Sequence, residues 1–335
     1  MEPLTSAHPV SEAFARRFNA RCGGSGLLPF SEFMELALYD HEVGYYLAKR
    51  RRAGTQPGTD FYTASGLKQV FAPLVVAATE RLLGPEHAAT CTFVEIGSEP
   101  GDALLDGFAH PFASRETVRI GESIKIPERA IVFSNELFDA QPFARVIHRE
   151  RVWREMGVRL EGGQLYWTEL PALSSEVTTC AASLPVDPGE GYTMDLPLRA
   201  GALMRSIAAE SWTGLMFAFD YGRAWDLLCT EHPRGIGRGY CSHRYADSLL
   251  ARAGEQDLTC HVCWDWLETA LRDTGFINIG RAGQEAFFIQ HSTEAIGAIV
   301  AAHASPLSAR RSQLKQLIHP ALMRQRFEAL WAVRE

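Results

Sequence analysis

The sequence of 335 residues has no apolar run long enough to cross a bilayer. Its longest stretch without a formal charge, Ala295–Ala309, is shorter than the ~20 apolar residues that a span needs. The first residues lack the apolar core of a secretory signal, and Glu2 and Glu12 beside Arg16 and Arg17 disfavour a transit peptide. The sequence therefore predicts a cytoplasmic protein without a membrane span.

The sequence also lacks an excess of basic residues and has few cysteines. Its formal net charge is −7 and 22% of its residues are charged, which disfavours binding of nucleic acid through bulk electrostatics. The basic run Lys49–Arg52 is interpreted as a solvated loop, with binding of nucleic acid or of an acidic partner as the alternative. Seven scattered cysteines, an odd number, fit reduced thiols. No second pair or matching histidine accompanies Cys260 and Cys263, so no metal is expected.

Several catalytic motifs and every internal repeat are absent. The sequence contains no G-x-S-x-G, no G-x-x-x-x-G-K-[ST] and no H-E-x-x-H segment. Their absence disfavours an α/β-hydrolase, a P-loop NTPase and a zinc protease. At ~100–200 residues per domain, the length predicts about two domains or one domain with a large insertion.

Three short apolar runs each stop at polar or glycine residues. They are Thr92–Ile96, Ala130–Phe133 and Leu215–Phe219. Such runs are typical of buried parallel strands, so the sequence predicts one α/β sheet, with a helix beginning near Asp102 after the first run. Sheets of this kind bind ligands at the carboxyl ends of their strands.

Other patterns predict elements around this sheet. Ser31 is expected to be the N-cap of a helix, and residues 66–83 to form a second helix that ends at Gly84. Further predictions are a hairpin over Arg145–Leu170 with its turn at Glu161–Gln164, a helix over Leu198–Glu210, an antiparallel strand pair formed by Phe276–Ile279 and Ala286–Ile289, and one or two helices over Ser305–Glu335.

Candidate site residues follow the predicted strands. Gly97 and Gly101 would let a ligand approach the backbone, although an ordinary turn between strand and helix has the same pattern. The segment Ser134–Pro142 brings an amide and two carboxylates to a strand end, where they can bind a ribose or a guanidinium, or cap a helix. The loop Gly58–Ser65 can clamp a ligand or form a surface turn.

Taken in order, these segments resemble the MidA-like S-adenosylmethionine-dependent methyltransferases, which include the mitochondrial complex I assembly-factor arginine methyltransferase. The matching segments are FSEFMELALYDHEVGYY at 30–46, GTDFYTAS at 58–65, FVEIGSEPG at 93–101, SNELFDAQPF at 134–143, FDYG at 219–222, RGYCSH at 238–243, DLTCHVCW at 257–264 and HPALMRQRFEAL at 319–330, which looks like the C-terminal Met-x-x-x-Phe helix of the family. The resemblance covers roughly residues 27–330.

The resemblance implies a class I methyltransferase fold, an α/β Rossmann-like doubly wound sheet. The expected division is an N-terminal helical cap at 1–75, the core at 76–144 and 211–291, an inserted hairpin and helix subdomain at 145–210, and a C-terminal helical tail at 292–335. The implied cofactor is S-adenosylmethionine, and the implied reaction is methylation of a protein arginine, on a respiratory complex subunit in the characterised branch. The other expected partner is a second copy of the chain in a homodimer.

The resemblance also implies roles for single residues. Glu136 or Asp139 would hold the acceptor guanidinium. The residues expected to line the cofactor pocket are Asp60, Glu95, Gly97, Gly101, Asn135 and Asp220.

Some positions depart from the pattern of the family. Glu99 replaces the middle glycine of the cofactor loop and Pro100 follows it. Only Asp102–Arg129 separates this loop from the next predicted strand. In the family, the same interval holds a helix and a second strand that ends in an acidic residue. Val118–Glu122 is the candidate replacement for that strand end. The alternative interpretation is therefore a catalytically impaired scaffold or assembly protein of the same fold.

Overall fold

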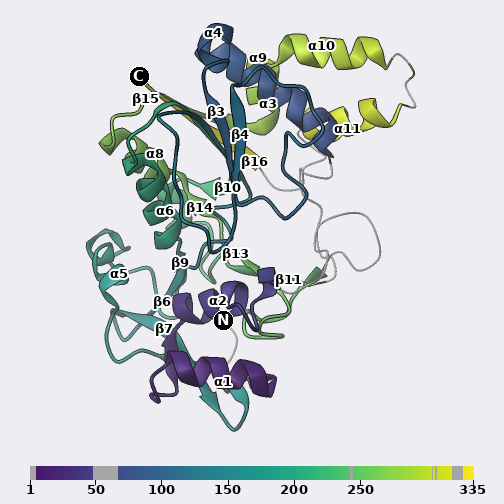
Figure 1. The fold of residues 1–335 in the computed structure, drawn as a ribbon. Coiled ribbons are helices and arrows are strands. Elements are labelled where there is room, and N and C mark those ends of the chain that lie inside the picture. Colours follow the sequence, from purple (N-terminus) through teal and green to yellow (C-terminus); the bar gives the residue numbers. More distant parts are fainter. Residues whose placement is uncertain (1–4, 48–66, 242–243, 304, 306–307, 319–326) are drawn as a thin grey trace. The chain divides into compact units, whose positions relative to one another are not determined.

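A computed structural model describes the chain except residues 1–4, 48–66, 242–243, 304, 306–307 and 319–326 (Figure 1). The chain forms two compact units. Unit 1 consists of Met1–Phe61, Asp139–Ala202 and Arg223–Asp265, and unit 2 of Tyr62–Phe138, Leu203–Gly222 and Trp266–Glu335. The domain boundaries predicted from the sequence stay a prediction.

Unit 2 contains the predicted α/β sheet, with the strand order β15-β16-β10-β5-β3-β4. The bounds are β3 Thr92–Ile96, β4 Ser114–Val118, β5 Arg129–Asn135, β10 Thr213–Arg223, β15 Ile277–Gly283 and β16 Phe327–Arg334. Strands β10, β5, β3 and β4 are parallel, and β16 runs antiparallel to both β10 and β15. The three apolar runs are thus confirmed as neighbouring parallel strands.

Helices pack against both faces of this sheet. Figure 1 shows α3 and α9 on one side of the sheet and α8 on the other. The helices are α3 Lys68–Leu83, α4 Pro85–Ala88, α6 Leu198–Ala209, which begins in unit 1, α8 Trp264–Asp273, α9 Gln284–His291, α10 Thr293–Ala302 and α11 Ala309–Ile318. The predicted helices at 66–83 and 198–210 are confirmed.

The core of unit 2 is rich in phenylalanine. Phe219 on β10 has its ring centroid 5.4 Å from that of Phe71 on α3 and 5.6 Å from that of Phe288 on α9. All three side chains are buried. Burying one such side chain contributes roughly 1.5–3 kcal/mol, so this cluster fixes α3 and α9 on the sheet.

The predicted helix near Asp102 is wrong. Residues 97–113 form turns and irregular backbone between β3 and β4. Gly101 and Gly107 have φ values of +79° and +81°, outside the helical region, and Pro100 lies beside the first of them. Too few residues remain between these breaks to form a stable helix.

The predicted antiparallel pair is half correct. Phe276–Ile279 overlaps β15, but Ala286–Ile289 lies in α9 because consecutive Phe287 and Phe288 are both buried against α3 and the sheet. The actual partner of β15 is β16, in a region where the sequence predicts helix. Phe327, Ala329 and alternate residues after them face the core, which is the period-two pattern of a strand. The other residues of the expected Met-x-x-x-Phe helix, up to 326, lie outside the described residues.

Unit 1 contains an antiparallel sheet with the strand order β1-β8-β7-β6-β9, and β2 pairs with β7. The bounds are β1 His8–Pro9, β2 Leu27–Pro29, β6 Ala144–Arg149, β7 Val152–Glu161, β8 Gln164–Glu169 and β9 Thr193–Leu196. The predicted hairpin is confirmed: Gly162 and Gly163, both with positive φ, connect β7 to β8. A two-residue turn of this kind favours glycine.

Short helices and a second sheet complete unit 1. The helices are α1 Glu12–Arg21, α2 Phe30–Tyr39, η1 Tyr45–Leu47, α5 Ser175–Thr178, η3 Ala181–Ser183 and α7 Trp225–Leu228. The small sheet has the order β12-β11-β13, with β11 Arg238–Cys241, β12 Arg244–Tyr245 and β13 Asp257–Thr259; β14 is Val262–Cys263. The predicted N-cap is wrong, because α2 begins at Phe30 and Ser31 is buried inside it.

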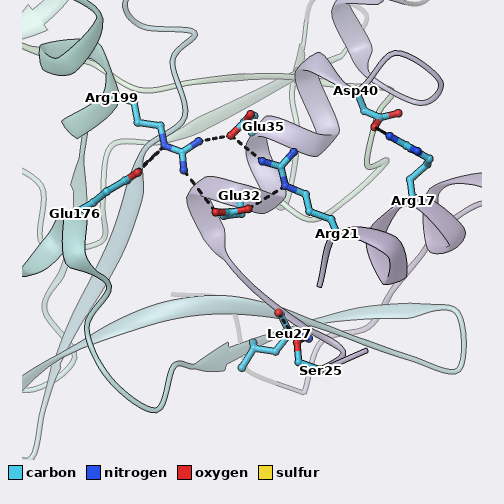
Figure 2. A network of polar contacts seen from close by, with 9 residues as sticks. All are labelled: Arg17, Arg21, Ser25, Leu27, Glu32, Glu35, Asp40, Glu176 and Arg199. Atoms are coloured by element: carbon cyan, nitrogen blue, oxygen red, sulfur yellow. Dashed lines mark hydrogen bonds and ion pairs between the residues drawn. The ribbon is translucent and has the colours of Figure 1, made fainter. Parts of the chain in front are cut away.

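An ion-pair network fixes α2 within unit 1 (Figure 2). Arg21 of α1 contacts Glu32 and Glu35 of α2, each at 2.9 Å. Arg199 contacts Glu35 and also reaches Glu176 of α5 at 3.2 Å. These side chains are partly exposed, so each pair contributes about 1 kcal/mol or less, but together they orient α2. Within the described ranges, no helix has the length and apolar character that crossing a bilayer requires.

Candidate functional site

The turn after β3 leaves its backbone accessible. Gly97 has φ +89° and is exposed, whereas Phe93–Ile96 are buried. The N–H of Gly97 donates to the carbonyl of Val118 at 2.9 Å. A Cβ at position 97 would lie 2.9 Å from Cδ1 of Leu137. The backbone conformation therefore favours glycine here, and a Cβ would require the side chain of Leu137 to shift.

The turn after β5 is joined to β10 by hydrogen bonds. The N–H of Glu136 donates to the carbonyl of Phe219 at 2.9 Å, and the N–H of Phe138 donates to Oδ2 of Asp220 at 2.9 Å. Asp220 is fully buried, and its Oδ1 accepts from the N–H of Tyr221 at 2.8 Å. Asp220 thus positions the segment 136–138.

The ends of β3 and β5 therefore lie beside residues 219 and 220 of β10. The strand register places Ile96 beside Ser134, and Asn135 beside Phe219, and β10 continues beyond this level to Arg223. Leu137 then contacts the turn at Gly97. The structure thus brings Gly97, Asn135, Glu136 and Asp220 into neighbouring segments, and their expected roles stay predictions.

Two buried polar atoms at this edge suit a ligand. Oγ of Ser98 and Oδ1 of Asn135 have no hydrogen-bond partner among the described residues. A buried polar atom without a partner costs about 1–3 kcal/mol, and a bound polar molecule would offset that cost. The amide nitrogen of Asn135 already donates to Oε1 of Glu136 at 3.2 Å.

The cofactor loop continues through residues that depart from the family pattern. Gly101 is exposed, has φ +79° and would meet nothing within 4 Å if it carried a Cβ. Glu99 is partly exposed and Pro100 is exposed, so neither is buried in the protein interior. Asp60 lies outside the described residues, and its expected role stays a prediction.

The second strand of the family, for which the sequence offered Val118–Glu122 as the candidate end, is present as β4. It pairs with β3 along its whole length and ends at Val118. The N–H of Arg119 donates to Oε2 of Glu122 at 2.7 Å. The candidate segment Val118–Glu122 thus forms a tight turn at the carboxyl end of β4. Arg119 is the first residue of this turn, and the exposed carboxylate of Glu122 follows three residues later.

Glu95 lines a cavity of about 220 Å³ between β3, β4 and the loop that connects them. The lining residues are Phe93, Glu95, Ala103, Leu105, Asp106, Arg115, Glu116, Thr117 and Arg119. Oε2 of Glu95 accepts from the N–H of Leu104 at 2.6 Å. Burial raises the pKa of Glu95 to about 7, although the Leu104 hydrogen bond and nearby Lys68 oppose the shift.

We expect Glu95 to make the stability of unit 2 depend on pH. The folded state binds the Glu95 proton more tightly than the unfolded chain, whose carboxyl has a pKa near 4.5. The contribution of Glu95 to the free energy of unfolding therefore falls as pH rises from about 4.5 to about 7, by about 3 kcal/mol in total. Urea denaturation of the wild type and of Glu95→Gln between pH 4.5 and 8 measures this contribution. The glutamine variant has no carboxyl at position 95, so its free energy of unfolding lacks the pH dependence that Glu95 causes.

The control for this experiment is Glu116→Gln, which changes an exposed carboxyl on the wall of the same cavity. Its pH profile should follow that of the wild type. A difference between wild type and Glu95→Gln that stays constant over the whole pH range would contradict the assignment.

Asp139, the other predicted catalytic residue, belongs to unit 1, whereas Glu136 belongs to unit 2. Asp139 is 6% exposed, and its carbonyl accepts from the N–H of Cys260 at 2.8 Å. The hydroxyl of Tyr39 donates to the carbonyl of the next residue, Ala140, at 2.8 Å. Asp139 is therefore held in unit 1 by contacts with α2 and with the segment after β13.

Tyr39, Tyr46 and Asp257, which lie near Asp139 in unit 1, carry no local signal in the sequence that marks them as site residues. The hydroxyl of Tyr46 donates to Oδ1 of Asp257 at 2.7 Å. The rings of Tyr39 and Tyr46 stack with their centroids 5.3 Å apart and an interplanar angle of 24°. All three residues lie in segments that resemble the family, but the sequence alone does not show that they are close together in the fold.

Comparison with known proteins agrees with this fold. The profile of the family described as "Putative S-adenosyl-L-methionine-dependent methyltransferase" matches residues 112–280. A solved structure from Burkholderia thailandensis, "a COG1565 superfamily member and likely methyl transferase" bound to S-adenosyl-homocysteine, has a TM-score of 0.83 and 24% identity, and the match covers 98% of this chain and 95% of that one.

A second solved structure, an uncharacterised COG1565 superfamily protein of the same organism, has a TM-score of 0.78 and 23% identity over the same shares of the two chains. No curated protein matches the chain significantly. The predicted class I methyltransferase fold and the predicted family resemblance are confirmed.

Proposed function

Because the chain belongs to this family of S-adenosylmethionine-dependent methyltransferases, we propose that it transfers a methyl group from S-adenosylmethionine to the guanidinium of an arginine in a protein. A subunit of a respiratory complex is the proposed acceptor, and the cytoplasm the proposed location. The predicted homodimer stays a prediction.

The residues at the carboxyl ends of β3 and β5 fit the cofactor. Gly97 is exposed, and Ser98 and Asn135 each carry a buried polar atom without a partner among the described residues. When bound, S-adenosylmethionine supplies a methyl group already activated on a sulfonium. The protein must then mainly align the acceptor, and such alignment contributes ~7–11 kcal/mol to catalysis.

The observation that carries the proposal is the conformation of Glu136. This residue has φ +53°, which costs a non-glycine residue about 1–3 kcal/mol, and its N–H donates to the carbonyl of Phe219 in β10. Strain of this kind is concentrated at functional sites. A carboxylate there would hold the acceptor guanidinium through paired hydrogen bonds and draw its charge away from the nitrogen that receives the methyl group.

A methylation assay tests the proposal. The protein is incubated with isotopically labelled S-adenosylmethionine and a library of arginine-containing peptides, and the products are analysed by tandem mass spectrometry. We expect labelled methyl groups on arginine with the wild type, and a loss of about 100-fold in rate with Glu136→Gln, which removes the charge and retains the shape. Glu86→Gln, an exposed carboxyl on α4, is the comparison variant.

Label found only on residues other than arginine would contradict the proposed acceptor but leave the methyltransferase activity. Wild-type protein that gives no label on any peptide or on a cell extract would contradict both.

A second candidate function is a scaffold of the same fold that has lost its catalytic pocket. Arg119, a cation, directly follows β4, and turns replace a helix between β3 and β4. Both features alter the region beside the candidate cofactor site. Calorimetric titration with S-adenosylhomocysteine separates the two candidates, because the scaffold would release no binding heat.

A further inference from the structure

The strand β4 lies at the end of the sheet of unit 2 and has an unpaired outer edge. Among the described strands it pairs only with β3. The Val118 carbonyl accepts from the N–H of Gly97 in this parallel register, so every second residue of β4 directs its backbone groups toward β3. The N–H and C=O groups of Arg115 and Thr117 therefore point away from the sheet, and they have no hydrogen-bond partner in the part of the chain that the structure describes. Such an edge can add a further strand.

The cavity that contains Glu95 lies beside this edge. Three consecutive residues of β4, 115–117, line it. Since successive side chains of a strand point to opposite faces, a cavity that touches all three residues reaches the backbone of the strand as well as one of its faces. Its volume of about 220 Å³ gives room for one side chain of a bound peptide.

The cavity contains polar groups without partners. Glu95 is 9% exposed, and its Oε2 accepts from the N–H of Leu104, whereas its Oε1 has no hydrogen-bond partner among the described residues. The guanidinium of Arg119 also lines the cavity and forms no hydrogen bond or ion pair within the described ranges. Phe93 and Leu105 add apolar surface. A carboxamide suits this lining, because it can donate to a carboxyl and accept from a guanidinium without the cost of desolvating a charge.

We propose that β4 is a docking site for an extended segment of a protein partner, which pairs with the outer edge of β4 as an added strand and inserts the carboxamide of a glutamine into the cavity. Backbone pairing would supply affinity, and the cavity would supply specificity. Because Val118, the last residue of β4, is bonded to Gly97, a segment added to β4 leads to the proposed cofactor site. That the partner is the protein substrate rests on the proposed function, whereas the docking itself does not.

A second copy of the chain fits this edge less well than a different protein. The β4 of a second copy could offer only three side chains to the cavity. Arg115 forms an ion pair with Asp106 of its own chain, and Thr117 lines the cavity of its own molecule. Glu116 is left, and its carboxylate would be repelled by that of Glu95.

Peptide binding to the full-length protein, without cofactor, tests the proposal. The probe is acetyl-Ser-Val-Thr-Gln-Thr-Val-Ser-amide. A second peptide carries norleucine in place of glutamine, and a third carries N-methyl groups on alternate backbone amides, which prevents strand pairing. We expect the first peptide to bind at least about tenfold more tightly than either of the others, because norleucine leaves buried polar groups without partners. In NMR spectra, the amide protons of Arg115 and Thr117 should exchange with solvent at least about tenfold more slowly when this peptide is bound.

Three variants separate strand pairing from side-chain binding. Thr117→Pro removes an outward N–H of β4 and leaves the hydrogen bonds to β3 in place, so it should weaken peptide binding by about tenfold or more. Thr117→Val retains that N–H, is the matched control and should bind as the wild type does. Arg119→Ala changes an exposed side chain and should lower the preference for glutamine over norleucine several-fold, which keeps the test decisive if the proline variant does not fold.

Equal binding of the glutamine and N-methylated peptides, or amide exchange at Arg115 and Thr117 that the glutamine peptide does not slow, would overturn the inference. A dimer that dissociates in Thr117→Pro but not in Thr117→Val would also overturn it, because β4 would then pair with a second copy. Peptide binding that meets these expectations in a protein that transfers no methyl group would support the docking site while contradicting the proposed function.

Discussion

Replacing Gly97 with valine is expected to abolish cofactor binding, with a loss of affinity of about 100-fold or more, equivalent to ~3 kcal/mol. The φ of +89° at this position is strained for a β-branched residue, and the new Cβ would lie 2.9 Å from Cδ1 of Leu137. The turn and the side chain of Leu137 would have to shift, which would change the backbone on which the cofactor is proposed to bind. Isothermal titration with S-adenosylmethionine measures the loss.

Gly275→Val is the matched control for this variant. Gly275 has φ +88°, nearly the same backbone conformation, but a Cβ there would meet nothing within 4 Å. It should therefore cost similar stability and leave cofactor affinity unchanged. If Gly97→Val bound S-adenosylmethionine as tightly as Gly275→Val, the cofactor would bind somewhere other than at the turn after β3.

Replacing Arg145 with methionine should destabilise unit 1 by about 3–5 kcal/mol. The Arg145 guanidinium donates twice to Asp195, at 2.7 and 2.9 Å, and these residues are 7% and 3% exposed. Methionine approximates the aliphatic volume but leaves the buried carboxylate without its cation. Because Trp167 lies 5.2 Å from the guanidinium, urea denaturation followed by tryptophan fluorescence reports this change.

Arg149→Met provides the comparison on the same strand, β6. Arg149 pairs with Glu169 at 2.6 Å, but both side chains are nearly 30% exposed. Its loss should cost about 1 kcal/mol or less, because water and salt screen an exposed pair. Equal destabilisation by the two variants would mean that the Arg145–Asp195 pair contributes no more than a surface contact.

Some elements could be predicted because their pattern is local. The runs Thr92–Ile96 and Leu215–Phe219 are buried on both faces, which is the mark of a central parallel strand, although β10 continues past the second run to Arg223. The hairpin turn at Gly162 and Gly163 requires positive φ at two successive positions, a requirement that glycine meets without strain.

Other elements could not be predicted from local pattern because their conformation depends on distant partners. Phe287 and Phe288 are adjacent apolar residues that suit a strand as well as a helix, and only the packing of α9 on α3 and the sheet decides for the helix. Phe327–Arg334 becomes a strand because both β10 and β15 pair with it. Those pairing partners lie about 50 and more than 100 residues away along the chain.

By itself the sequence determined the chemistry available to the molecule: glycine after β3, an amide and a carboxylate after β5, a buried aspartate in β10, and segments whose order resembles one family. Such features depend on residue type and short spacing. Only the tertiary structure decided which groups meet. It brought Leu137 onto Gly97, gave Glu95 its buried environment and set Tyr46 against Asp257, since contacts between distant residues arise from strand register and core packing.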